Sequence, residues 1–331
     1  MAANLTPQYH EAEARYRAAT TPEEKLAALE EMWRQLPKHK SSEKLQADLK
    51  KKISSTRKAL QQGGRKGATR ADPFAIPHSG AGQVTLTGTP NTGKSSIVGG
   101  LTHAQVTVAD YPFSTPLPVP GMMPFEDIQI QLVDTPPVTA DHVPPGLPGL
   151  WRTTDALLVV ADLASDTLLE DSETCLSLLA DRHLQLTDRR EPVPDAPGEL
   201  LPVPGLIIAN KADTPNAPET LPLLRESVAE RARIEPLSTR DPEQMARLPG
   251  ICFELVGVIR VYAKPPGKRP DLTDPFILPI GGDVHALARK VYRGLEHRLR
   301  SARLWGFGVN DGQQVHLDHV LHDRDIVELH M

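Results

Sequence analysis

Cysteine and aromatic residues are scarce in this sequence, and long hydrophobic runs are missing from it. Only Cys175 and Cys252 occur among 331 residues. They lie far apart and outside any metal-ligand spacing, so we expect reduced, buried thiols without a disulfide, redox or metal role. No stretch approaches the ~20 apolar residues that a membrane span requires. The N-terminal segment carries charges throughout, which argues against a signal peptide and favours a cytoplasmic location.

The charge balance excludes a protein whose whole surface is adapted to nucleic acid. Lysine and arginine number 37 against 42 aspartates and glutamates, which gives a net charge of -5. A local basic patch is still compatible with this balance. The hydrophobic fraction of 39% and the charged fraction of 24% are typical of a globular protein with room for two or three domains.

The patterns divide the chain into a helical region at 1–70, an α/β domain at 80–256 and a small mixed domain at 257–331. In the first region, Thr21-Pro22-Glu23-Glu24 predicts a helix start with a capping box. The following apolar face consists of Leu26, Leu29, Met32 and Trp33. A second helix from near Ser42 and a short connection around Pro37 predict an antiparallel helical hairpin, with a stripe of Leu45, Leu49, Ile53 and Leu60.

The second helix and its tail are basic. Two interpretations stay open: a solvated helix face, or a contact with RNA phosphates that needs no base readout. The basic residues are Lys44, Lys50, Lys51, Lys52, Arg57, Lys58, Arg65, Lys66 and Arg70, against Glu43 and Asp48.

The central region alternates apolar strands with helical patterns, which predicts a doubly wound parallel α/β sheet. Its expected strands are Val84–Thr87, Ile128–Val133, Ala156–Ala161 and Leu206–Ala209. Prolines cluster at 112–148 and 192–222, so loops are expected there. In the last region we expect strands at Val258–Ala263, Phe276–Ile280 and Ile326–Leu329 and a helix at Val284–Leu299 that crosses a small sheet.

A phosphate-loop pattern, G-x-x-x-x-G-K-S, follows the strand Val84–Thr87 directly. Glycines let backbone N–H groups converge on anionic oxygens, and the next helix offers its positive end. Lys94 would reach the β- and γ-phosphates, and Ser95 would ligate Mg²⁺. A chance match is the alternative, which the preceding strand and the following helix disfavour. The expected phosphate site consists of Gly88, Thr89, Pro90, Asn91, Thr92, Gly93, Lys94, Ser95 and Ser96.

The tetrapeptide Asn210-Lys211-Ala212-Asp213 selects the base. The Asp213 carboxylate can accept both the N1 hydrogen and the exocyclic amine of guanine, a donor pair that adenine lacks. Asn210 and Lys211 would brace the loop and cover the ring. By itself the tetrapeptide could be a polar turn, but after a phosphate loop it favours GTP over ATP. Ser238 and Thr239 are weaker candidates for the last base-side loop.

Two segments between these loops are candidate switches. Asp134 ends the strand Ile128–Val133, where its carboxylate could hold a Mg²⁺-bound water. Upstream, Thr115 in Tyr111-Pro112-Phe113-Ser114-Thr115 is the best candidate to complete the Mg²⁺ shell when a γ-phosphate is present. Spacing alone does not exclude that Thr115 is an ordinary loop residue.

Together, GTPNTGKSS, YPFST, DTP and NKAD resemble the Obg-type translation-factor GTPases, a branch of the TRAFAC class. More closely, the chain resembles the developmentally regulated GTP-binding (DRG) proteins nearly end to end. IRVYAKP, LWG, DHVL and DRDIV are similar to the C-terminal TGS domain of that family. The resemblance implies a ubiquitin-like β-grasp fold for 257–331 and a role near the ribosome.

The resemblance also implies that Asn91 helps to hold a K⁺ beside the phosphates, where the ion would stabilise developing charge. The alternative role for Asn91 is a loop-stabilising amide. The chain departs from the family where D-x-x-G becomes Asp134-Thr135-Pro136-Pro137, because Pro137 lacks the N–H that would sense a γ-phosphate. It also lacks the family's extra small domain, and only a proline-rich, charged connector is expected between Ala161 and Asn210.

The leading hypothesis is a slow GTPase in which Lys94, Mg²⁺ and K⁺, with Asn91 and Thr115, supply the catalytic electrostatics. The alternative is a GTP-sensing module with negligible hydrolysis that docks on RNA or the ribosome, which Pro137 favours. A P-loop kinase or ATPase is a third option that Asp213 disfavours. GTP and GDP are the expected ligands, and no membrane partner is expected.

Overall fold

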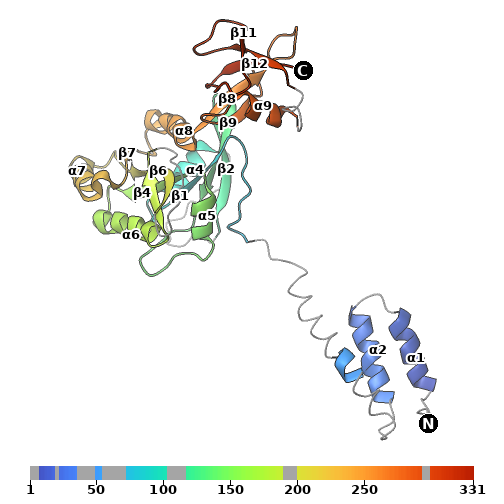
Figure 1. Ribbon diagram of the computed structural model, residues 1–331. Helices are drawn as coiled ribbons and strands as arrows, with labels where there is room; N and C mark the ends of the chain where they lie inside the picture. The colour runs from blue at the N-terminus through green and yellow to red at the C-terminus, as the bar shows by residue number, and fades with distance from the viewer. Residues whose placement is uncertain are drawn as a thin grey trace. The chain divides into compact units, whose positions relative to one another are not determined.

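The computed structural model describes residues 7–18, 22–35, 49–53, 72–102, 117–188, 200–292 and 299–331. The chain forms two compact units, Met1–Asp72 and Pro73–Met331. Figure 1 shows their helices and strands.

The first unit is helical, as expected. It contains α1 (Pro7–Ala18), α2 (Pro22–Gln35) and a helical segment at 49–53, which share a core of Tyr9, Ala12, Leu29, Met32 and Leu49. The sequence does not predict α1, because it offers few large apolar residues for a helical stripe. Trp33 was expected on the buried face but is 39% exposed, since the core contacts are made by Leu29 and Met32. Thr21, the turn at Pro37 and most of the basic tail lie outside the described residues.

The larger sheet of the second unit has the order β2-β3-β1-β4-β6-β5, and β7 (Ile234–Pro236) pairs with β6. Its parallel strands are β7 and β1 (Gln83–Thr87), β3 (Ile128–Asp134), β4 (Ala156–Asp162), β5 (Leu184–Thr187) and β6 (Leu201–Asn210). The antiparallel strand β2 (Val119–Phe125) pairs with β3. All four strands expected in this region are therefore present, and β2, β5 and β7 are additional.

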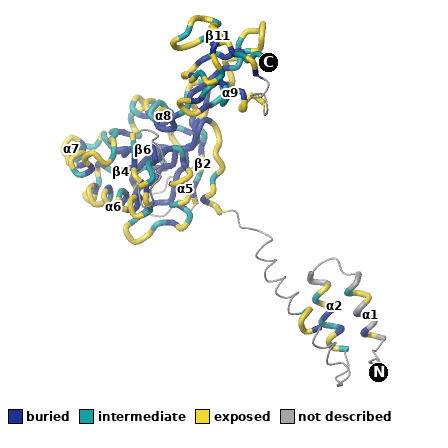
Figure 2. Tube along the Cα trace, in the orientation of Figure 1, coloured by how far each residue is buried: buried dark blue, intermediate teal, exposed yellow. Residues whose placement is uncertain are grey.

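Helices cover both faces of this sheet, and each face has its own core. Figure 2 shows the strands between these helices as largely buried. On one face lie α5 (Leu147–Thr153), α6 (Leu168–Ala180) and α7 (Ala217–Val228). On the other lie α4 (Lys94–Leu101) and α8 (Pro242–Val256). The strands between them are long apolar runs because both of their faces are buried. The fold is the expected doubly wound α/β sheet.

The prolines do not mark loops alone, so that expectation was wrong. Pro120 and Pro124 lie in β2, which the strand order places at an edge of the sheet, where prolines are tolerated. Pro202 and Pro204 lie in β6. The Leu201 N–H donates to the His183 carbonyl, so the alternate positions 202 and 204 direct their nitrogens away from β5. Pairing with β4 begins only at Gly205, so no sheet hydrogen bond is lost.

The interval between Ala161 and Asn210 is also more structured than expected. It contains α6, β5 and the first half of β6, so it is not only a connector. The apolar residues of α6 repeat at helical spacing, and its buried side chains include Leu168, Cys175, Leu178 and Leu179.

The smaller sheet has the order β11-β10-β12-β8-β9 and is packed against α9 (Val284–Val291). Its strands are β8 (Val258–Ala263), β9 (Phe276–Pro279), β10 (Ser301–Trp305), β11 (Gln313–Val315) and β12 (Asp325–His330). This is a β-grasp arrangement, with β8 and β12 parallel. The helix was expected to continue to Leu299, but it ends at Val291. Tyr292 is extended, and Leu299 joins the core from the segment that enters β10.

Candidate functional site

The phosphate loop lies between β1 and α4, as its sequence position predicts. Gly93 has φ 93°, and a Cβ there would lie 2.2 Å from the Asn210 Nδ2 atom. At Gly88, with φ 155°, a Cβ would lie 2.4 Å from the Val160 carbonyl oxygen. Only glycine fits these two positions, which close the backbone tightly around the space in front of α4. Asn91 has φ 64° and is exposed at the tip of the loop.

Lys94 is buried and is held by the loop itself. Its Nζ donates to the carbonyls of Gly88 at 2.9 Å and Thr89 at 2.7 Å. Burial lowers the pKa of Lys94 to about 8, although the nearby Asp134 carboxylate opposes this shift. An anion in front of the loop would favour the charged ammonium further. The contacts therefore place a cation at the end of the candidate site where the phosphates are expected.

Ser95 and Asp134 meet at the same place. The Ser95 hydroxyl donates to Asp134 Oδ2 at 2.6 Å. Burial raises the pKa of Asp134, and the Ser95 hydrogen bond and the Lys94 charge oppose the rise. The second oxygen, Oδ1, is buried without a hydrogen-bond partner among the described residues. A hydroxyl beside an unsatisfied carboxylate oxygen fits the oxygen ligands that Mg²⁺ prefers.

The segment after Asp134 is tied to the phosphate loop. The Thr135 hydroxyl donates to the Leu86 carbonyl at 2.5 Å, and the Val138 N–H donates to the Gly88 carbonyl at 3.1 Å. Pro136, Pro137 and Val138 are buried, and Val138 packs in the core. Pro137 has no N–H, and the next amide is already bonded. This segment therefore offers no free amide at 137 or 138 to a γ-phosphate.

The base loop is built at the end of β6, beside the phosphate loop. The Asn210 Nδ2 donates to the Thr92 carbonyl at 2.8 Å, which joins the two loops directly. Lys211, with φ 62°, bonds Asp162 at 2.5 Å. Sequence reasoning missed Asp162, although its place directly after the strand Ala156–Ala161 was a usable signal.

Asp213 is held in position by the loop that begins at Ser238. The Ser238 hydroxyl donates to Asp213 Oδ1 at 2.6 Å, and Arg240 lies 3.3 Å from Oδ2. The Ser238 hydrogen bond is the main cause that lowers the pKa of Asp213, so this carboxylate is ionised at neutral pH. The loops are joined because the Ala212 N–H donates to the Leu237 carbonyl. Arg240 is a further residue that sequence reasoning missed.

The structure describes two of the three remaining candidate site residues. Ser96 lies in the first turn of α4, and Thr239 follows Ser238 in the base-side loop. Thr115 lies outside the described residues. Cys175 and Cys252 are free and buried, as expected, and burial raises the pKa of Cys175 to about 11 and that of Cys252 to about 12.

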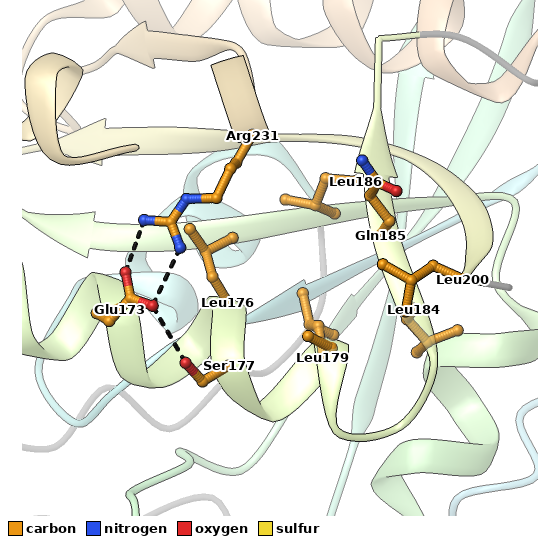
Figure 3. A pocket seen from close by; sticks show the side chains of 10 residues that line it. Glu173, Leu176, Ser177, Leu179, Leu184, Gln185, Leu186, Leu200 and Arg231 are labelled. Atoms are coloured by element: carbon orange, nitrogen blue, oxygen red, sulfur yellow. Dashed lines mark hydrogen bonds and ion pairs between the residues drawn. The ribbon is translucent and has the colours of Figure 1, made fainter. Parts of the chain in front are cut away.

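An apolar pocket lies elsewhere, between α6 and β5 (Figure 3). Its lining includes Leu176, Leu184 and Leu200, and none of its lining residues belongs to the loops described above. At its rim, Arg231 forms two hydrogen bonds with Glu173, at 3.0 and 2.6 Å. The pocket is therefore separate from the candidate nucleotide site.

Comparisons with known proteins point to the class of GTP-binding proteins. A family model described as 50S ribosome-binding GTPase matches residues 83–189, and a TGS domain model matches residues 259–331. The chain is 25% identical to an uncharacterized GTP-binding protein of Methanocaldococcus jannaschii, over 93% of this chain and 92% of that relative. It is 22% identical to developmentally-regulated GTP-binding protein 2 of Homo sapiens, over 92% of this chain and 98% of that relative.

The fold and the site define a P-loop GTPase domain followed by a TGS domain. Within that class, the expected resemblance to the developmentally regulated GTP-binding proteins is confirmed, because the chain has homologues in that family over most of its length. Among the helices that the structure describes, none is long and apolar enough to cross a membrane.

Proposed function

We propose that this protein binds GTP and GDP with Mg²⁺ in the cytoplasm and hydrolyses GTP slowly. The observation that carries the proposal is the 2.8 Å hydrogen bond from Asn210 to the Thr92 carbonyl, which holds the base loop against the phosphate loop. A buried lysine then lies at one end of a single site and an ionised carboxylate at the other. This arrangement suits a guanine base linked to a phosphate chain.

In the proposed reaction, Lys94 and the amides of the phosphate loop hold the β- and γ-phosphates. Ser95 and Asp134 would hold Mg²⁺, which supplies charge stabilisation of the phosphates, and Thr115 would complete its shell. Water is the nucleophile, and no described side chain qualifies as its general base. Positioning and electrostatics supply most of phosphoryl-transfer catalysis, so we expect an unassisted rate on the order of 10⁻⁴ to 10⁻² s⁻¹.

The same proposal includes the division of the chain at 1–70, 80–256 and 257–331 and an association with the ribosome or RNA. The support for the association is the exposed, consecutive Lys50, Lys51 and Lys52 in the first unit, together with the TGS domain. A GTP-sensing module with negligible hydrolysis is the second candidate. Pro137 favours its negligible hydrolysis, since with the Val138 amide already bonded this segment offers no free amide to a γ-phosphate.

Nucleotide profiling of the full chain tests the proposal. Calorimetry with Mg²⁺ should detect GTP and GDP but not ATP, and the D213N variant should exchange guanine for xanthine nucleotides, which offer a carbonyl in place of the amine. K94A should lose all nucleotide binding, because the phosphates lose their cation. Equal affinities for ATP and GTP, or binding of neither, would contradict the proposal. Tight GTP binding without phosphate release would favour the sensing module.

A further inference from the structure

The turn between β2 and β3 is held by residues of the TGS domain. This turn carries Glu126, with φ 50°, and Asp127. Arg260 of β8 donates through Nη1 to Glu126 and to Asp127, the latter at 2.7 Å. The Tyr262 hydroxyl donates to the other Asp127 oxygen at 2.5 Å, and Arg324 donates to Glu126 at 2.5 Å. The contact is therefore a network of two cations and two carboxylates rather than a single surface pair.

Arg260 lies at the centre of this network and is only 3% exposed. Its Nε and Nη2 atoms donate to the two oxygens of Asp323 at 3.1 and 2.6 Å. The guanidinium also lies 5.1 Å from the ring centre of Phe253 and 5.8 Å from that of Phe125. A buried cation is costly unless it is paired and hydrogen-bonded, and breaking such a network is far more disruptive than removing an exposed ion pair.

The strand β3 connects this network to the candidate Mg²⁺ ligand. It begins at Ile128, directly after Asp127, and ends at Asp134, which accepts the Ser95 hydrogen bond. Seven residues at ~3.4 Å each span on the order of 20 Å. Ile130, Leu132 and Val133 are completely buried, and β2 pairs with β3 along its whole length. A close-packed strand transmits a displacement at one end to the other because its surroundings leave no space to absorb it.

The other segment that leaves Asp134 is less suited to this task. Thr135 and Val138 bond to the backbone of Leu86 and Gly88, and Pro137 offers no amide. Among the described segments that leave Asp134, the β2–β3 hairpin is thus the one with a direct contact to the TGS domain. The far end of the hairpin is held by Arg260, Tyr262 and Arg324 of that domain, with the buried Arg260 at the centre.

We propose that Arg260 is a positioning residue that couples the nucleotide state at Asp134 to the TGS domain through the β2–β3 hairpin. This inference rests on the proposed GTP and GDP binding. Coupling of this kind is reciprocal. If the bound nucleotide changes the contact between the β2–β3 turn and the TGS domain, that contact also changes the relative affinities for GTP and GDP. It also requires that GTP and GDP act differently on the hairpin.

The test compares R260M with R260K and with K264M in the full chain. K264M is a matched control because Lys264 directly follows the same strand but pairs with Glu328 inside the TGS domain. Calorimetry measures the ratio of the Kd values for a non-hydrolysable GTP analogue and GDP. Spin labels at E226C and Q314C, both exposed positions, report the distance between the G domain and the TGS domain, and the native cysteines are buried.

We expect R260M to change the Kd ratio by about fivefold or more, the lower end of typical allosteric coupling, and to abolish the nucleotide-dependent distance change. R260K should retain part of both effects, because it keeps the charge but not the forked contacts. K264M should leave both at the wild-type value. An unchanged ratio in R260M, or a wild-type distance that is the same in both nucleotides, would overturn the inference. Failure of the wild type to bind either nucleotide would instead overturn the proposed function.

Discussion

At the residue scale, the proposed base recognition depends on how firmly Asp213 is held. Its Oδ1 atom accepts the Ser238 hydroxyl, while one-third of the side chain is exposed to solvent. The hydroxyl fixes the carboxylate before any base arrives, so the ordering cost is lower when a ligand binds. The same hydrogen bond keeps the pKa of Asp213 low, and a charged acceptor suits the two donors of guanine.

The S238A variant tests this positioning. We expect the affinities for GTP and GDP to fall alike by about five- to tenfold, which is about 1 to 1.4 kcal/mol, because the carboxylate must then be ordered when the base binds. Calorimetry on both nucleotides measures the change. S165A is a control, since Ser165 makes a comparable 3.0 Å contact with Thr167 at an exposed site. A loss confined to one of the two nucleotides would contradict a role in base recognition.

Asn91 is the second residue whose role can be tested alone. Its exposed position at the tip of the phosphate loop suits an amide oxygen that helps to hold K⁺. We expect GTP hydrolysis to be faster in KCl than in NaCl at equal ionic strength, and N91D or N91A to reduce the difference. Phosphate release measures both rates. Equal rates in the two salts for the wild type would leave Asn91 with a loop-stabilising role.

At the scale of elements, the segment that follows β3 is fixed where a switch would be expected to move. A P137G variant should restore a backbone N–H and release conformational constraint. We expect the affinity for the GTP analogue relative to that for GDP to rise by about threefold or more, because one hydrogen bond of about 1 kcal/mol is added. Stability should fall by about 1 kcal/mol, because glycine raises the entropy of the unfolded chain.

Calorimetry and thermal unfolding measure these two effects separately. P145G is the matched control, because Pro145 is exposed in the following loop and should lower stability without changing nucleotide preference. If P137G leaves the affinity ratio at the wild-type value, the missing amide is not what restricts the switch.

At the scale of the whole molecule, the basic N-terminal unit and the acidic remainder of the chain have different expected partners. Lys50, Lys51 and Lys52 are exposed, although Lys52 also lies 5.9 Å from the Tyr16 ring centre and so contributes to packing. If these lysines contact RNA phosphates, binding must weaken as salt rises, because bound counterions are released.

Sedimentation with ribosomes over a range of KCl concentrations tests this contact. We expect the triple variant K50Q/K51Q/K52Q to lower the slope of log K against log salt by roughly 2 to 3, at about 0.7 to 0.9 per phosphate. K25Q, an exposed lysine on α2, should change it little. A wild-type slope near zero would show that phosphate contacts do not drive association.

The sequence alone determined the parts of the site that are contiguous along the chain. The phosphate loop, Asp134 and the base loop each follow a buried strand, and parallel strands bring their carboxyl ends to the same edge of a sheet. Local pattern was therefore sufficient to predict the strands β1, β3, β4 and β6. It was also sufficient to predict the loops that follow them. It was insufficient for β2 and for the start of β6, because a proline's tolerance in a strand depends on which neighbour its nitrogen faces.

Only the tertiary structure decided which distant side chains meet. Lys211 reaches Asp162 across 49 residues, Ser238 reaches Asp213 across 25, and Arg260 reaches Asp127 across 133. Such pairs are set by strand order and by close packing between elements, and neither leaves a period or a motif in the chain. The bonding of the Val138 amide to Gly88 is of the same kind. The sequence showed that Pro137 lacks a donor, but packing determined that the next donor is also occupied.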